Sequence, residues 1–143
     1  MITTRRGTVG FTCGVFDFVH AGHVAMLEAA RRQCSYLIVG LQTDPSIDRT
    51  HKNVPIQSTY GRYVQLRGLT CVDEIIPYDS ELNLIDILTI EPIDMRFVGE
   101  EYQSMDFTGK QTCIDRGITL VYIPRQGGTS SRTLRERIIQ RTL

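Results

Sequence analysis

The sequence lacks an excess of charge of either sign and any long apolar run, and each absence excludes a class of protein. Sixteen lysines and arginines balance sixteen aspartates and glutamates, so no overall field favours nucleic acid or an anionic membrane. A membrane-spanning helix would need about 18 consecutive apolar residues, and no such stretch is present. Residues 1–6 also lack the apolar core of a signal peptide. We expect a cytoplasmic protein with no nucleic-acid or membrane partner.

Closely spaced cysteines are also missing. The four cysteines are far apart, with no C-x-x-C pair and no nearby histidine pair of the kind that binds zinc: Cys13, Cys34, Cys71 and Cys113. We expect reduced, mostly buried thiols and no dedicated protein cage for a metal ion. The first glycine-containing turn does not carry G-x-G-x-x-G, which argues against a dinucleotide-binding oxidoreductase.

What the sequence does contain is an alternation of short apolar runs with segments of helical periodicity. The expected strands lie at 8–13, 36–41, 72–77, 95–99 and 118–123, and the expected helices at 24–33, 58–69, 80–90, 108–116 and 131–140. This order predicts an α/β fold, a doubly wound, Rossmann-like parallel sheet of five strands with flanking helices. We expect residues 1–143 to form a single domain, with ligands bound at the carboxyl ends of the strands.

The segment between the first strand and the first helix has the properties of a phosphate site. Gly14 opens a tight turn, and the helix that follows adds a partial positive charge at its N-terminus. His20 and His23 place two imidazoles at that end of the helix. Gly22, which lies between them, leaves the backbone open to a phosphate oxygen.

A second anion-binding segment precedes the last expected helix. Ser130 and Ser131 offer hydroxyl and backbone N–H donors at a helix start, and Arg125 adds a planar, permanently charged fork. A long polar loop, 42–57, carries Arg49, His51 and Lys52, which could fold over a triphosphate. All of these segments follow strands, so they meet at one edge of the sheet.

These motifs resemble those of the nucleotidylyltransferases, and in particular of the cytidylyltransferase family. Residues 14–17 match the G-x-F-D motif of that family and 20–23 match its H-x-G-H motif. Residues 125–131 are similar to R-T-x-G-x-S-T, although Gln126 and Ser131 stand where the family usually has threonine. The resemblance extends over almost the whole chain and is closest to the small glycerol-3-phosphate cytidylyltransferases.

The resemblance implies a role for each matching residue. The implied catalytic residues are His20, His23 and Arg125. The implied nucleotide-binding residues are Gly14, Val15, Phe16, Asp17, Gly22, Glu100, Ser130 and Ser131. Arg62 matches a position that binds the acceptor phosphate, and we group Lys52 and Arg49 of the loop with it. Thr70 replaces a second arginine that the glycerol-3-phosphate enzymes have, which weakens the assignment of the acceptor.

The reaction that this resemblance implies is transfer of CMP from CTP to a phosphorylated alcohol. With glycerol 3-phosphate as acceptor the products are CDP-glycerol and pyrophosphate, with Mg²⁺ bound to the nucleotide and a homodimer as the assembly. A phosphate monoester is mostly dianionic at neutral pH, so the attack needs no general base. One alternative is an adenylyltransferase acting on a sugar phosphate or a vitamin phosphate. A non-catalytic nucleotide-binding module is another alternative, from a different class.

Overall fold

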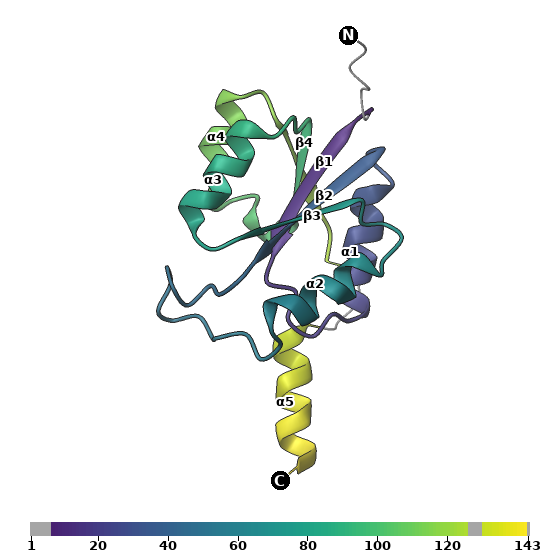
Figure 1. The fold of residues 1–143 in the computed structure, drawn as a ribbon, viewed down its shortest axis with the longest axis vertical. Helices are drawn as coiled ribbons and strands as arrows, with labels where there is room; N and C mark the ends of the chain where they lie inside the picture. Colours follow the sequence, from purple (N-terminus) through teal and green to yellow (C-terminus); the bar gives the residue numbers. More distant parts are fainter. Residues whose placement is uncertain (1–6, 126–129, 143) are drawn as a thin grey trace.

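The computed structural model describes residues 7–125 and 130–142 (Figure 1). Five strands alternate with helices along the chain. The strands are β1 (Val9–Gly14), β2 (Tyr36–Gln42), β3 (Glu74–Tyr78), β4 (Met95–Gly99) and β5 (Thr119–Ile123). The helices are α1 (Ala21–Arg31), α2 (Thr59–Arg67), α3 (Glu81–Ile90), α4 (Lys110–Asp115) and α5 (Ser131–Thr142), with a short 3₁₀ helix, η1 (Glu100–Tyr102).

The strands form one parallel sheet in the order β3-β2-β1-β4-β5, with β1 at its centre. The chain therefore winds outward in both directions from β1, and the predicted doubly wound α/β fold is confirmed. The continuous apolar runs of β1 and β2 are explained by this position, because both of their faces are covered. Phe11, Leu37 and Ile38 are fully buried.

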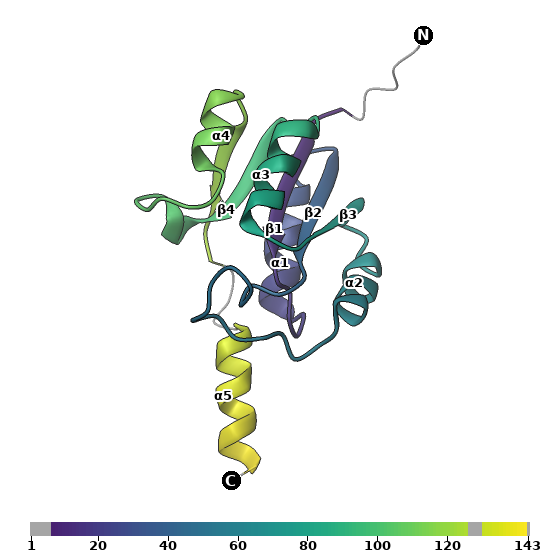
Figure 2. The ribbon, with the colours of Figure 1, turned by 60° about the vertical axis from the view of Figure 1, so that its left-hand side comes forward.

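The sheet is covered by helices on both faces (Figure 1). Leu27 of α1 and Leu66 of α2 belong to the apolar cluster on one face. Leu84 of α3 and Cys113 of α4 belong to the cluster on the other. α5 extends away from the sheet beyond the carboxyl ends of the strands (Figures 1 and 2). The edge where the expected ligands bind therefore lies between the sheet and the start of α5.

Three features of this fold bear on the sequence predictions. All four cysteines are free, and three of them are buried, whereas Cys13 is half-buried at the end of β1. In the described ranges, no helix is both long and apolar enough to cross a membrane. α1 begins three residues earlier than 24–33 predicted, at Ala21, because the His20 side chain caps its first turn.

Candidate active site

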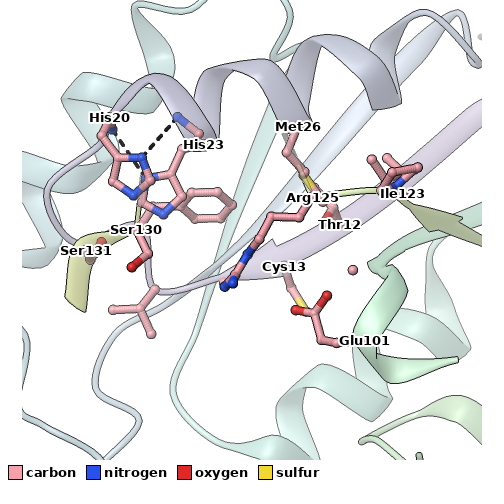
Figure 3. Close-up of a pocket in the computed structure, with 16 residues that line it drawn as sticks. Thr12, Cys13, His20, His23, Met26, Glu101, Ile123, Arg125, Ser130 and Ser131 are labelled. Carbon is pink, nitrogen blue, oxygen red and sulfur yellow. Dashed lines mark hydrogen bonds between the residues drawn. The ribbon is translucent and has the colours of Figure 1, made fainter. Parts of the chain in front are cut away.

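A cavity of about 310 Å³ opens at the carboxyl ends of β1, β4 and β5 (Figure 3). Most of the residues predicted to bind the nucleotide meet there although they lie far apart in the sequence. The predicted residues that line it are Gly14, Val15, Phe16, His20, Gly22, His23, Arg125, Ser130 and Ser131. The imidazoles lie on one side of this cavity and the Arg125 guanidinium extends into it (Figure 3).

The two histidines form a reciprocal capping box at the start of α1. His20 is the N-cap residue, and its Nδ1 accepts a hydrogen bond from the backbone N–H of Gly22 at 3.0 Å. His23 is the third helical residue, and its Nδ1 accepts from the backbone N–H of His20 at 3.4 Å. Since a neutral imidazole carries one hydrogen, both rings must be protonated at Nε2. The cap therefore selects the tautomer in which each Nε2 is a donor.

The surroundings of the two rings favour the neutral form of each. The rings are stacked with centroids 3.9 Å apart, and Phe16 lies 5.3 Å from the ring of His23. Burial and the neighbouring His20 imidazole lower the pKa of His23 from 6.5 to about 4, although Asp17 acts in the opposite direction. Burial also lowers the pKa of His20. His20 Nε2 is buried and has no hydrogen-bond partner among the described residues, so its capacity to donate is unused.

We expect His23 to stay neutral on acidification until the pH approaches about 4. Because its pKa is lower in the folded state, the unfolded chain binds the proton first. The stability that the neutral ring contributes is complete above pH 6.5 and is lost as the pH falls from 6.5 to about 4. NMR titration of the His23 ring protons measures the pKa directly. In His23→Gln the free energy of unfolding should fall less over this interval, and an equal fall in both proteins would contradict the assignment.

The turn before α1 is held in an unusual backbone conformation. Phe16 and Phe18 have φ values of 52° and 54°, a left-handed region that residues with a side chain rarely adopt. Phe16 is buried, and its ring packs near Gly14, where an added Cβ would lie 3.2 Å from it. The contacts of these two residues hold the turn after β1 in the conformation that lines the cavity.

Asp17 has a structural role at this turn and does not line the 310 Å³ cavity. Its buried carboxylate accepts hydrogen bonds from the backbone N–H groups of Ile56 and Gln57 and pairs with Arg135 at 2.5 Å. Burial alone would raise the pKa of Asp17, but these hydrogen bonds and the Arg135 charge outweigh it and leave the pKa below 3.8. Asp17 thus ties the turn to the 42–57 loop and to α5.

The structure places Arg62, predicted to bind the acceptor phosphate, behind the site and not in either cavity. Only 1% of Arg62 is exposed. Its guanidinium donates to the backbone carbonyls of Gln57, Val15, Gln42 and Thr43 and to the hydroxyl of Thr59. With its donors occupied by the protein, Arg62 joins the first turn, the end of β2 and the start of α2. In this structure it supports the backbone around the site and has no guanidinium donor left over for a substrate.

The remaining predicted residues lie at the margins of the cavity. Arg49 pairs with Glu81 at 3.1 Å and lines an adjoining cavity. Lys52 lines a separate hollow beside Phe16 and His23. The carboxylate of Glu100 accepts a long hydrogen bond, 3.5 Å, from the backbone N–H of Arg125, and the neighbouring Glu101 lines the cavity instead. The predicted segment 126–129 lies outside the described residues.

Other lining residues were not among the predicted site residues. Thr12 and Cys13 line the cavity from the end of β1, Met26 from α1 and Glu101 from η1. The position of Thr12 and Cys13 at the carboxyl end of the expected strand 8–13 could have indicated that they lie at the ligand-binding edge. Arg135 lies one helical turn after Ser131, a spacing that puts both side chains on the same face of α5, and both contact Asp17. Nothing in the sequence indicates that Glu101, and not Glu100, lines the cavity.

The parallel α/β sheet brings two histidines, an arginine and two serines around one cavity, as the resemblance to the nucleotidylyltransferases implies. Residues 11–137 match the family model described as cytidylyltransferase-like, and the chain belongs to this family.

Several bacterial proteins called bifunctional protein HldE are similar to this chain. The protein from Caulobacter sp. (strain K31) is 35% identical over 127 residues, which are 88% of this chain and 26% of that protein. The protein from Syntrophotalea carbinolica is 35% identical over 142 residues, which are 98% of this chain and 29% of that protein. The chain therefore spans little more than a quarter of the length of these relatives.

Solved structures share the fold at lower sequence identity. The lipopolysaccharide core biosynthesis protein from Thermoplasma volcanium superposes with a TM-score of 0.68 at 23% identity, over 86% of this chain and 99% of that one. Pantothenate synthetase from Thermus thermophilus gives a TM-score of 0.65 at 16% identity, over 91% of this chain and 62% of that one. These likenesses concern the fold alone.

Proposed function

We propose that this chain transfers a nucleotidyl group from a nucleoside triphosphate to the phosphate of a sugar or polyol phosphate, releasing pyrophosphate. The observation that carries the proposal is the fixed tautomer of His20 and His23 beside Arg125. Two neutral Nε2–H donors and a permanent cation face one cavity, and such a set matches a triphosphate. The 310 Å³ cavity lies at the ends of the strands, where α/β sheets bind their ligands.

In the proposed reaction an oxygen of the acceptor phosphate attacks the α-phosphorus of the nucleotide. The new oxygen–phosphorus bond forms as the bond to the leaving pyrophosphate breaks. His20, His23 and Arg125 stabilise the negative charge that develops on the phosphate oxygens. The backbone of the 14–17 turn positions these oxygens. No proton needs to be removed, because the attacking phosphate is already dianionic at neutral pH.

Mg²⁺ is part of this proposal as a companion of the triphosphate. Within residues 7–125 and 130–142, no group of three or more His, Cys, Asp or Glu side chains is placed to hold a metal ion. Magnesium commonly binds through substrate phosphates and one or two carboxylates, and Glu101 is a carboxylate that lines the cavity. When bound, the ion would neutralise charge on the phosphates.

The acceptor that we propose is broader than the glycerol 3-phosphate implied by the sequence resemblance. Arg62, which that resemblance assigns to the acceptor phosphate, is occupied by backbone carbonyls. An adjoining cavity of about 210 Å³, lined by polar and apolar side chains, gives room for the carbon skeleton of a sugar phosphate. We therefore treat transfer from CTP to glycerol 3-phosphate as one of several reactions to be tested.

Pyrophosphate release should be measured for ATP, CTP, GTP and UTP, each with glycerol 3-phosphate and with five- to seven-carbon sugar phosphates. We expect release that requires both substrates and is strongest for one base. Activity with CTP and glycerol 3-phosphate alone would support the narrower enzyme and contradict the sugar-phosphate acceptor. Nucleotide binding without release in any combination would overturn the enzymatic proposal in favour of a nucleotide-binding module.

A further inference from the structure

The adjoining cavity contains a buried cation that no part of the proposed nucleotide site uses. This cavity, about 210 Å³, shares Thr12, Cys13, Gly14, Met26 and Gly99 with the 310 Å³ cavity described above. Because the two hollows meet at the ends of β1 and β4, one small molecule can reach from one to the other. Arg96 of β4 lines the adjoining cavity and is only 4% exposed.

The hydrogen-bonding capacity of Arg96 is only partly used. Its Nη1 donates to the backbone carbonyl of Thr108 at 2.6 Å, and its Nη2 is 3.6 Å from the sulfur of Cys13. The guanidinium lies 5.0 Å from the ring centroid of Phe107. Its Nε is buried without a partner, and no carboxylate in the described ranges forms an ion pair with it. A buried charge left without a counter-ion is costly, so the site is incomplete as it stands.

The other charges of the cavity satisfy one another. Arg49 and Glu81 form an ion pair at 3.1 Å, and the side-chain amide of Gln42 also donates to Glu81 at 3.4 Å. The one carboxylate that lines this cavity is thus already engaged. Arg96 is the positive charge that remains, and a ligand with one negative charge at this end would balance it.

The position of Arg96 in the sheet places that negative charge away from the reacting phosphate. In the register of β1 and β4, Arg96 lies opposite Phe11, three residues before Gly14. From there its guanidinium extends to the sulfur of Cys13; it lines the adjoining cavity but not the 310 Å³ cavity where His20 and His23 lie. A molecule whose phosphate reacts at the edge would therefore present its far end, several carbons away, to Arg96.

We propose that Arg96 recognises a carboxylate at the end of the acceptor opposite its phosphate, so that the substrate is a phosphorylated sugar acid. The inference rests on the proposed nucleotidyl transfer and specifies its acceptor. The edge of a guanidinium formed by Nε and Nη2 binds a carboxylate through two parallel hydrogen bonds, and on Arg96 this is the underused edge.

The test compares acceptors that differ in one group. Sorbitol 6-phosphate and 6-phosphogluconate differ only in a CH₂OH group that becomes a carboxylate, and fructose 1,6-bisphosphate carries a second phosphate. We expect kcat/KM to be about 10- to 100-fold higher for 6-phosphogluconate than for sorbitol 6-phosphate. Equal values, or a preference for the bisphosphate, would overturn the assignment of a carboxylate. Absence of pyrophosphate release with every acceptor would instead count against the proposed function.

Variants of Arg96 assign the preference to this side chain. In Arg96→Met the ratio of kcat/KM for 6-phosphogluconate to that for sorbitol 6-phosphate should fall to near one, while the Kd for the nucleotide stays unchanged. In Arg96→Lys this ratio should lie between one and the wild-type value. Arg116→Met is the matched control, because Arg116 donates to the backbone carbonyl of Leu88 and lines neither cavity. If Arg96→Met does not fold, calorimetric binding of the two acceptors to the wild-type chain replaces it, and equal affinities would refute the proposal.

Discussion

His20→Asn and His23→Gln should each lower kcat by about 10²- to 10³-fold while the chain remains folded. Both substitutions remove an imidazole Nε2–H that we assign to the phosphates of the nucleotide. Both also keep the capping of α1, since asparagine is a favoured N-cap residue and glutamine at the third helical position completes a capping box. Steady-state pyrophosphate release with saturating substrates measures the effect.

The alanine variants separate catalysis from helix capping. His20→Ala removes the cap as well as the donor, so it should lose the same activity and also about 1 kcal/mol of unfolding free energy. His20→Asn should lose the activity alone. Near-wild-type turnover in His20→Asn together with low activity in His20→Ala would show that the cap, and not the Nε2–H donor, is what the reaction needs.

Arg62→Met should lower the free energy of unfolding by about 3 to 5 kcal/mol, the range typical for breaking a buried charged network. Methionine fills much of the volume but leaves the carbonyls of Val15, Gln42, Thr43 and Gln57 without this donor. These carbonyls belong to the turn after β1, to the end of β2 and to the 42–57 loop. Chemical denaturation monitored by circular dichroism measures the loss.

Arg67→Met provides the control for this prediction. Arg67 belongs to the same helix, α2, but it is exposed, and its guanidinium lies 5.7 Å from the ring centroid of Tyr63. Its substitution should change the unfolding free energy by less than about 0.5 kcal/mol. Equal stability of Arg62→Met and Arg67→Met, with a raised KM for the acceptor in Arg62→Met, would return Arg62 to the substrate site.

Local patterns were sufficient for much of the fold and for the centre of the site. The apolar runs of β1 and β2 are long because both faces of central strands are buried, and that condition is visible in the residues themselves. The segment 14–23 contains its turn, its helix cap and both histidines within a few residues. Its geometry is therefore decided by short-range contacts, such as those of His20 with Gly22 and His23.

Long-range packing decided what the side chains of the arginines and acids do. An arginine in a sequence does not show whether its donors face a ligand or the backbone, and Arg62 was placed at the substrate for that reason. The structure turns it toward carbonyls from two other segments.

The sequence likewise does not show whether the charge of Arg96 is balanced by the protein. Within 95–99 it stands in an apolar strand, and nothing in the sequence indicates whether a carboxylate faces it. The fold pairs Glu81 with Arg49 and leaves Arg96 buried, with no counter-ion among residues 7–125 and 130–142. The sequence by itself determined the order of the strands and helices and the phosphate-binding turn, because those depend on neighbouring residues. The tertiary structure alone decided which charges are neutralised by the protein, because that depends on segments that meet only after folding.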